Sequence, residues 1–346
     1  MRACVLTATG GIDKLQVTQV PDAPPPGTGE VRVALRAAAL NHLDLFVADG
    51  MPGTADRFPW VVGADGAGSI EAVGPGVTTL HVGDRVMLNP GISDYSCEFC
   101  RAGEHSLCVN YRLLGEHLPG TLAELVTVPA HNVVHAPTLS PALTWGEAAA
   151  FSLVTLTAWR MLVTRAKLRA GETVLVWGIG GGVSLTALRI AKLFGARVIA
   201  TSSDDAKLAA AKQLGADVTL NHKTQKVSQE IRALTNKRGV DVVIENVGAA
   251  TWDESLRSLR RGGRLVTCGA TSGPQVNLDL RRLFWHHWSL LGSTMGNAAE
   301  YAEIVRRLSN GELRPIVDRV FPLARAREGY ERLERGEQLG KIVIEI

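Results

Sequence analysis

A glycine-rich turn between a strand-like run and an amphipathic helix constrains the fold of this chain more than any other feature. The strand-like run covers residues 173–177, and apolar residues recur at helical spacing from 185 to 193. Between them lie Gly178, Gly180, Gly181, Gly182 and Val183. Glycines tighten such a turn and let backbone N–H groups approach an anion at the positive end of a helix. The segment predicts a cradle for the pyrophosphate of a dinucleotide.

The turn is not a strict G-x-G-x-x-G, so a glycine turn without a ligand is the alternative. Its context favours the cradle. From about residue 155 to residue 295, strand-like runs such as 197–202, 241–247 and 263–269 alternate with helical segments. Such alternation predicts a parallel sheet covered by helices, in an α/β chain.

The N-terminal part predicts a second, β-rich domain. Short strand-like runs at 30–40, 68–74 and 83–88 are separated by glycine and proline turn signals, as in a β-barrel. The tail 341–346 alternates like a strand and could return to this first domain. A length of 346 residues with 46% hydrophobic residues supports two cores of this kind.

Composition excludes several classes of function. The net charge of +3 is small, and the basic cluster 257–264 is interpreted as a solvated helix end instead of a nucleic-acid site. The most apolar stretch, 148–159, is too short to span a bilayer, so we expect no membrane partner. The N-terminus lacks the pattern of a signal peptide, which predicts a cytoplasmic protein.

The end of the second strand of the dinucleotide domain bears on cofactor choice. An acid there binds the ribose 2′-OH of NAD and repels a 2′-phosphate. Here the strand ends in Ser202 and Ser203, with Lys207 nearby, although Asp204 and Asp205 follow closely. NADP(H) is therefore preferred over NAD(H).

Three of the five cysteines crowd into one short segment. Asp94, Cys97, Cys100 and Cys108 supply four potential metal ligands, with Glu104 or His105 as substitutes for the carboxylate. Such a set can close a tetrahedron around Zn²⁺ and leave no position for a substrate, so the predicted metal is structural. Three free surface thiols are the alternative.

Together these segments resemble the medium-chain dehydrogenase/reductase superfamily, which contains zinc alcohol dehydrogenases, quinone oxidoreductases and enoyl reductases. Further matching segments are Gly63–Gly68, Val73–Gly76, Gly83–Val86 and Gly340–Val343. The resemblance implies a GroES-like catalytic domain of residues 1–154 and 296–346, and a Rossmann NAD(P)-binding domain of residues 155–295. It also implies a homodimer or homotetramer, with the apolar run 288–291 as an edge strand that pairs with a second subunit.

The catalytic zinc of the alcohol dehydrogenases has no counterpart ligands in this chain. The three ligand positions correspond by resemblance to Asn41, Ala64 and Leu153, and the proton-relay position to Leu43. None of the three can hold zinc, so we expect no catalytic zinc and no such Lewis acid.

The stretch Asn41-His42-Leu43-Asp44 is instead similar to the zinc-independent quinone oxidoreductases. Asn41 is the first catalytic candidate, because its amide can donate to a substrate carbonyl as a hydride arrives; ordering a loop is the alternative. Asp44 is a second candidate, or a buried support of the cleft wall. His42 could donate a proton or bind the cofactor ribose, but a lone loop histidine is commonly solvated.

The resemblance also implies cofactor contacts. Thr157 would lie beside the nicotinamide, and Lys341 would meet the pyrophosphate. Two segments would present backbone groups to the carboxamide: Cys268, Gly269 and Ala270 in one, and Ser293, Thr294 and Met295 in the other.

Three functions follow as hypotheses. The first is an NAD(P)H-dependent reductase of quinones or enones without catalytic zinc. The second is an alcohol dehydrogenase, acting on alcohols and aldehydes, whose zinc is held by an atypical set drawn from His42, Asp44 and Asp65. The third is a nonenzymatic NADPH-binding protein.

Overall fold

The computed structural model describes residues 1–50 and 58–346. They form two compact units: Met1–Leu153 with Asn297–Ile346, and Val154–Gly296. Each domain boundary expected from the sequence lies one residue from a boundary of these units.

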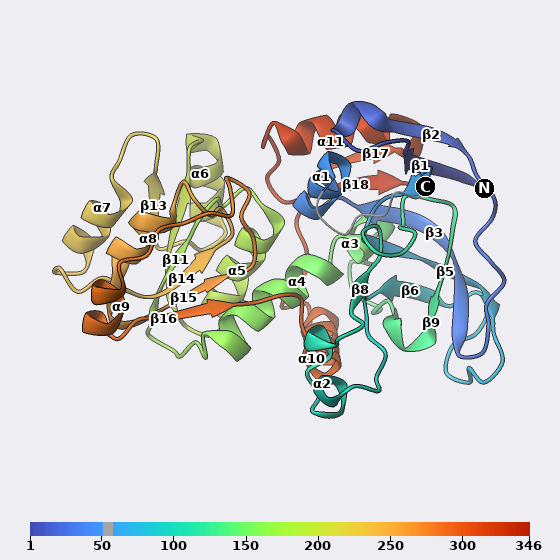
Figure 1. Ribbon diagram of the computed structural model, residues 1–346, viewed down its shortest axis with the longest axis horizontal. Helices are drawn as coiled ribbons and strands as arrows, with labels where there is room; N and C mark the ends of the chain where they lie inside the picture. The colour runs from blue at the N-terminus through green and yellow to red at the C-terminus, as the bar shows by residue number, and fades with distance from the viewer. Residues whose placement is uncertain (51–57) are drawn as a thin grey trace. The chain divides into compact units, whose positions relative to one another are not determined.

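The first unit is built on β-strands, as its turn-punctuated sequence predicts (Figure 1). A seven-stranded sheet has the order β10-β6-β5-β3-β18-β17, with β9 paired to β3, and a smaller sheet has the order β2-β1-β4. The strands are β1 (Arg2–Leu6), β2 (Leu15–Gln19), β3 (Glu30–Ala39), β4 (Trp60–Val61), β5 (Asp65–Val73), β6 (Arg85–Leu88), β7 (Gly91–Ile92), β8 (Arg112–Leu113), β9 (Leu125–Pro129), β10 (Val133–His135), β17 (Val317–Pro322) and β18 (Lys341–Glu345).

The alternating tail does return to the first unit. Strand β18 pairs antiparallel with β3, with Val343 opposite Ala39, and parallel with β17. Helices of this unit are α1 (His42–Asp49), α2 (Glu98–Arg101), α3 (Trp145–Ala149), α10 (Ala298–Ser309) and α11 (Ala326–Glu334), and α4 (Ser152–Trp159) runs from this unit into the next. Tyr330 of α11, Leu40 and Ile342 belong to one buried core cluster, which therefore joins segments from both ends of the chain.

The second unit is the predicted parallel sheet covered by helices. Its strand order is β13-β12-β11-β14-β15-β16, and every pair is parallel. The strands are β11 (Thr173–Val176), β12 (Arg197–Ser202), β13 (Val218–Asn221), β14 (Val240–Glu245), β15 (Leu259–Thr267) and β16 (Ser289–Gly292); the helices are α5 (Gly182–Leu193), α6 (Asp205–Gln213), α7 (Val227–Leu234), α8 (Trp252–Ser258) and α9 (Leu280–His286). All residues of β11 and β14 are buried, which explains why apolar side chains predominate in both strands.

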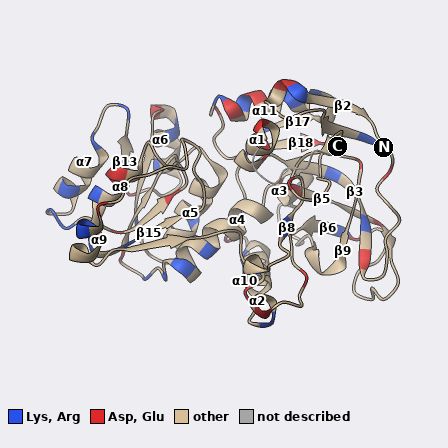
Figure 2. Cartoon of the chain, viewed as in Figure 1, with Lys and Arg blue, Asp and Glu red and all other residues tan. Residues whose placement is uncertain are grey.

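The basic cluster 257–264 was predicted to be a solvated helix end, and the structure bears this out only in part. Only its first residues end a helix, α8, whereas the stretch from Leu259 onward is the first part of strand β15. Arg260 pairs with Asp241 at 2.5 Å, and Arg264 pairs with Glu172 at 2.5 Å, so these two cations serve ion pairs within the unit. Charges of both signs are interspersed over α7, α8 and α11 (Figure 2).

None of the helices in the described ranges is both long and apolar enough to cross a membrane.

Candidate functional site

A cluster of buried polar side chains lies in the first unit, where α1, β5 and β18 begin. We define the buried cluster as Asn41, Asp44, Asp65 and Lys341, whose exposed fractions are 6%, 2%, 0% and 4%. The Nζ atom of Lys341 donates to Oδ1 of Asn41 at 2.5 Å and to Oδ2 of Asp65 at 3.1 Å. The sequence suggested separate roles for all four residues, and the ion pair between Lys341 and Asp65 was not predicted.

Gly340 explains how a lysine reaches this position. Its φ is +111°, and a Cβ atom there would lie 2.5 Å from the carbonyl oxygen of Ile316. Glycine alone fits such a close approach, and the following N–H, of Lys341, donates to that same oxygen at 2.9 Å. The Gly340–Lys341 pair thus starts β18 with the lysine side chain in the cluster.

The side-chain amide of Asn41 is fully engaged within the protein. Its Nδ2 donates to the carbonyl oxygen of Ala39 at 3.2 Å and to Oδ2 of Asp65 at 3.0 Å, while its Oδ1 accepts from Lys341. An amide NH₂ has two hydrogens, and both have acceptors here. This arrangement differs from the predicted donation to a substrate carbonyl and corresponds to the alternative of a polar residue that orders its surroundings.

Asp44 supports the first turn of α1. Its Oδ2 accepts from the backbone N–H of Asn41 at 2.7 Å. Burial raises the pKa of Asp44 to about 7, against the lowering effect of that hydrogen bond and of the positive charge of Lys341. The carboxyl group can therefore be neutral or ionised near neutral pH.

His42 is the first residue of helix α1, not a loop residue as the sequence suggested. Burial and the positive charge of Lys341 lower the pKa of His42. The imidazole is thus neutral at neutral pH, because its surroundings disfavour the second ring proton and the positive charge that it brings.

The three positions that the resemblance assigns to zinc ligands do come together. Asn41 bonds to Asp65, whose chain neighbour is Ala64, and the backbone N–H of Leu153 donates to Oδ1 of Asp65 at 2.9 Å. At this point the chain supplies an ammonium and a carboxylate. The Nζ of Lys341 is engaged here, which differs from its predicted contact with a pyrophosphate.

The glycine turn of the second unit leads directly into a helix N-terminus without a side-chain cap. Gly178 has a φ of +61°, and its N–H lies 3.4 Å from Oγ1 of Thr201. Helix α5 starts with Gly181 as its N-cap, and no side chain caps its first turn. Uncapped N–H groups at a helix N-terminus suit a phosphate, so the turn fits the pyrophosphate of a nicotinamide dinucleotide.

The two acids that follow β12 have hydrogen-bond partners within the protein. Asp204 caps α6, since its carboxylate accepts from the backbone N–H groups of Ala206 at 2.8 Å and Lys207 at 3.2 Å. Asp205 accepts from Nδ2 of Asn221 at 2.7 Å. Ser202 ends the strand itself, and its hydroxyl oxygen accepts from the N–H of Asp204 at 3.1 Å.

Two of the residues predicted beside the nicotinamide contact each other. The hydroxyl of Thr157, on α4, donates to Sδ of Met295 at 3.6 Å, and both residues are buried. Met295 adopts a φ of +46°, so the segment after β16 turns sharply there. Cys268 follows β15 directly, and burial raises the pKa of its thiol to about 12, which keeps the thiol protonated.

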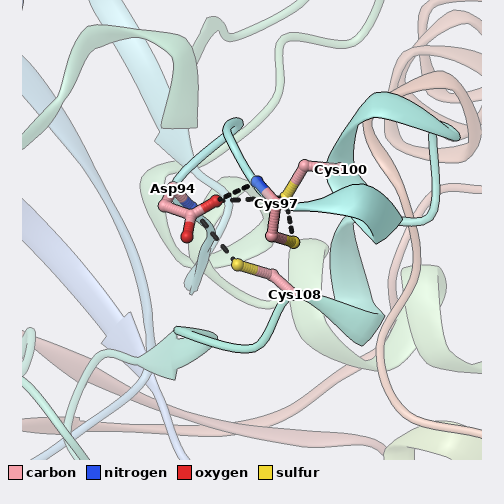
Figure 3. A group of neighbouring side chains, drawn as sticks. All are labelled: Asp94, Cys97, Cys100 and Cys108. Atoms are coloured by element: carbon pink, nitrogen blue, oxygen red, sulfur yellow. Dashed lines mark hydrogen bonds between the residues drawn. The ribbon is translucent and has the colours of Figure 1, made fainter.

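Asp94, Cys97, Cys100 and Cys108 converge in the first unit, as Figure 3 shows. One ligand atom from each lies within 4.8 Å of all the others, and the sulfur atoms of Cys97 and Cys100 are 3.5 Å apart. Sulfurs that share a tetrahedral zinc at about 2.3 Å lie roughly 3.8 Å apart. The four donors therefore fit a zinc ion, and we call them the metal lobe.

Hydrogen bonds lower the pKa values of two of these donors and so favour the charged forms that bind a cation. A hydrogen bond from the backbone N–H of Cys100 is the main cause that lowers the pKa of Cys97 to about 7. Several hydrogen bonds, the strongest of them from the N–H of Ser96, hold the pKa of Asp94 below its usual range. Burial raises the pKa of Cys100 to about 12, a cost that a bound cation offsets.

The alternative fourth ligands do not join the metal lobe. The Nδ1 of His105 accepts from the backbone N–H of Ala298 at 3.3 Å, and its ring packs on Tyr95 with centroids 4.5 Å apart. Among the described residues, the donor group contains Asp94 and neither Glu104 nor His105.

A buried acid of the second unit escaped the sequence analysis. Glu245, at the end of β14 and 0% exposed, accepts from the N–H groups of Val247 at 2.7 Å and Gly248 at 3.1 Å, and from the hydroxyls of Thr251 and Ser255. It orders the loop between β14 and α8. Its position after an apolar strand was the one available signal.

Known proteins match both units. The alcohol dehydrogenase GroES-like domain matches residues 27–138, and the zinc-binding dehydrogenase family matches residues 182–310. An acryloyl-coenzyme A reductase of Metallosphaera sedula is 33% identical over 331 residues, which cover 95% of this chain and 96% of that protein. An alcohol dehydrogenase of Geobacillus stearothermophilus is 33% identical over 338 residues, which cover 96% of each chain.

Solved structures agree with these matches. A crystal structure described as an NAD-dependent alcohol dehydrogenase is 44% identical, covers 100% of both chains and has a TM-score of 0.95. A cobalt- and zinc-bound thermostable alcohol dehydrogenase from Pyrobaculum aerophilum is 35% identical, with a TM-score of 0.90, over 100% of this chain and 99% of that one.

Proposed function

Because the chain belongs to the zinc-type alcohol dehydrogenase family of the medium-chain dehydrogenase/reductase superfamily, we propose that it is an NAD(P)H-dependent reductase of enones or quinones. The reaction adds a hydride to a carbon conjugated with a carbonyl group. It uses no catalytic zinc.

The buried cluster is the observation that carries this proposal. At the positions that the family resemblance assigns to the ligands of a catalytic zinc, the chain has Asn41, Ala64 and Leu153. Lys341 and Asp65 form an ion pair there instead. An ammonium repels a metal cation, so this pair disfavours zinc at the same point.

One relative supports a conjugated carbonyl compound as the substrate. The Metallosphaera sedula protein is described as an acryloyl-coenzyme A reductase, and its match runs through both units. An acryloyl thioester is an α,β-unsaturated carbonyl compound, which belongs to the substrate class proposed here.

The second unit would hold the cofactor in this mechanism. The uncapped start of α5 and the glycine turn would bind the pyrophosphate of NAD(P)H, and Thr157 and Met295 would position its nicotinamide ring. Bound there, the cofactor would supply the hydride.

We propose NADP(H) as the preferred cofactor. Ser202 stands where an acid would repel a 2′-phosphate, and the two acids that follow are engaged by backbone amides and by Asn221. The hydroxyl of Ser203 and the positive charge of Lys207 would then favour binding of the 2′-phosphate of NADP(H). The description of one solved relative as NAD-dependent makes NAD(H) the competing choice.

We propose one structural zinc per subunit, held by Asp94, Cys97, Cys100 and Cys108. Their donor set and mutual distances support it. All four come from one segment of the first unit, which a zinc ion would fasten together.

An alcohol dehydrogenase is the second candidate, because several relatives carry that description. It requires a catalytic zinc held by an atypical set drawn from His42, Asp44 and Asp65. Both carboxylates of this set are already engaged, Asp65 by Lys341 and Asp44 by a backbone N–H.

We also propose self-association through the second unit. Strand β16 is the last strand of its sheet, and helix α9 exposes Leu280, Phe284 and Trp285 by 64–65% (Figure 1). An unpaired edge beside exposed apolar side chains suits a second copy of the chain, in a homodimer or homotetramer.

One experiment separates the candidates. Metal content per subunit is measured on purified protein, together with NADPH and NADH oxidation by a quinone, an enone and an aldehyde. One zinc with quinone or enone turnover supports the proposal. Two zincs with aldehyde turnover would establish the alcohol dehydrogenase, and tight NADPH binding without any turnover would indicate a binding protein.

A further inference from the structure

A surface cavity of about 730 Å³ lies entirely within the first unit. Its walls come from helix α3 with the loop before it, and from strands β3, β17 and β18. We call it the arginine cavity, because Arg36, Arg85 and Arg314 line it together with Glu147 and Glu345. Pockets for small organic molecules have volumes of about 300–1,000 Å³, so this cavity has room for one.

Glu147 is neutralised by Arg314. The Nε and Nη2 atoms of Arg314 donate to the two carboxylate oxygens of Glu147 at 2.5 and 2.9 Å. These hydrogen bonds lower the pKa of Glu147, and a two-point contact between planar groups fixes the orientation of both. The pair leaves the guanidinium groups of Arg36 and Arg85 against the single carboxylate of Glu345, so the remaining charge of the lining is positive.

Arg85 is held in one orientation by two contacts. Its Cζ atom lies 3.9 Å from the centre of the Trp145 ring, and its Nη2 donates to the carbonyl oxygen of Leu143 at 2.9 Å. Stacking of the guanidinium on the indole is a favourable cation–π contact. Because a guanidinium carries five N–H groups, Arg85 can also bind a carboxylate while it keeps both contacts.

Part of the lining is apolar. Val317 and Val320 of β17 and Val343 of β18 contribute to it. Val343 packs closely against α3, since a Cβ atom on Gly146 would lie 3.3 Å from its Cγ1. Val320 is 50% exposed, and a hydrocarbon group that covered it would remove apolar area from water. The arginine cavity therefore combines positive charge with apolar surface.

We propose that the arginine cavity binds a small organic anion with an apolar body, namely an aliphatic carboxylate. The carboxylate pairs with Arg36 and Arg85, and the hydrocarbon chain covers the valines of β17 and β18. The site is separate from the buried cluster, because Lys341 and Glu345 lie at opposite ends of β18, roughly 13 Å apart at about 3.3 Å per residue. It is also separate from the glycine turn, which belongs to the other unit.

The first test compares three probes on the whole protein. Ligand-observed NMR titrations measure the dissociation constants of hexanoate, acetate and hexanamide. Acetate lacks the apolar body and hexanamide lacks the charge, so each should bind at least about tenfold more weakly than hexanoate. Equal binding of hexanoate and hexanamide would overturn the inference. Tighter binding of inorganic phosphate than of hexanoate would also overturn it, because the apolar body would then contribute nothing.

The second test locates the bound hexanoate. Arg36→Gln and Arg85→Gln should each weaken its binding about tenfold, because each removes a charged donor. Arg327→Gln is the matched control, since this exposed arginine of α11 does not line the cavity, and the affinity should be unchanged. Wild-type affinity in both cavity variants would refute the inference. If Arg85→Gln does not fold, Arg36→Gln gives the same comparison, because Arg36 is an exposed residue.

Both tests are independent of the proposed function, because they measure binding and require no turnover. Each titration is repeated with saturating NADPH, and the affinity for hexanoate should stay within about twofold of its value without the cofactor. Displacement of hexanoate by NADPH would instead assign it to the cofactor site and would contradict binding in the arginine cavity.

Discussion

The ammonium nitrogen of Lys341 lies 2.5 Å from the amide oxygen of Asn41, although 300 residues separate the two in the chain. This hydrogen bond ties the first residue of β18 to the N-cap of α1. With Asp65 it closes a triangle of buried polar groups, in which each residue bonds to the other two. We therefore expect these three residues to contribute together to the stability of the first unit.

Asn41→Ala should destabilise the first unit. The substitution removes one acceptor from a buried ammonium and one donor from Asp65, and hydrogen bonds to charged groups contribute about 1.5–3 kcal/mol each. Urea unfolding of the variant and of wild type measures the decrease in the free energy of unfolding. Loss of enone turnover at unchanged stability would contradict this expectation and would return Asn41 to the substrate-contacting role that the sequence suggested.

Asp44 should make stability depend on pH in an unusual direction. Its pKa is about 7 in the folded protein, against 3.8 for an ordinary aspartate. Between these values the folded state binds more protons than the unfolded state, so stability falls as pH rises. The contribution is complete below the unfolded pKa and is lost as pH passes through the folded one. The slope is at most about 1.4 kcal/mol per pH unit.

Asp44→Asn isolates this effect, because asparagine keeps an acceptor for the N–H of Asn41 and does not titrate. Urea unfolding at pH 5 and pH 7 should show the variant gaining stability relative to wild type at the higher pH. If the free energy of unfolding changed equally with pH in both proteins, Asp44 would be ionised throughout this range.

Local patterns predicted much of the fold. A parallel sheet was predicted from the apolar residues of β11, β12 and β14 and from the glycine turn. This succeeded because side-chain periodicity and backbone freedom act over short stretches of chain. Strand β15 was recognised only in its second half, since its arginines and glycines, at 260–264, have little strand preference. Pairing with β14 and ion pairs to Asp241 and Glu172 hold that part in the sheet.

The candidate site was predictable only where its residues are close in sequence. The donors of the metal lobe lie within one segment, so their spacing indicated the group that the structure brings together. Asn41, Asp65 and Lys341 come from three distant segments, and neither periodicity nor spacing links them. The resemblance suggested a phosphate contact for Lys341, and its pairing with Asp65 became visible only in three dimensions.

Cys100→Ser should remove the metal and loosen the first unit. Three ligands bind zinc much more weakly than four, and structural zinc contributes directly to folding. We expect metal content near zero, a lower Tm and unchanged NADPH affinity, because the nucleotide turn lies in the other unit. Cys268→Ser is the control, since this cysteine lies outside the metal lobe. Equal zinc content in the two variants would refute the assignment.

Ser202→Asp should change the cofactor preference. A carboxylate at the end of β12 would accept from a ribose 2′-OH and repel a 2′-phosphate, so kcat/KM should fall for NADPH and rise for NADH. Repulsion between like charges near a protein surface corresponds to about 10–100-fold in the ratio of the two values. Ser309→Asp, at the end of α10 in the other unit, adds the same charge elsewhere and should leave the ratio unchanged. An unchanged ratio in Ser202→Asp would mean that another part of the second unit recognises the 2′ position, because a charge placed beside the phosphate could not be without effect.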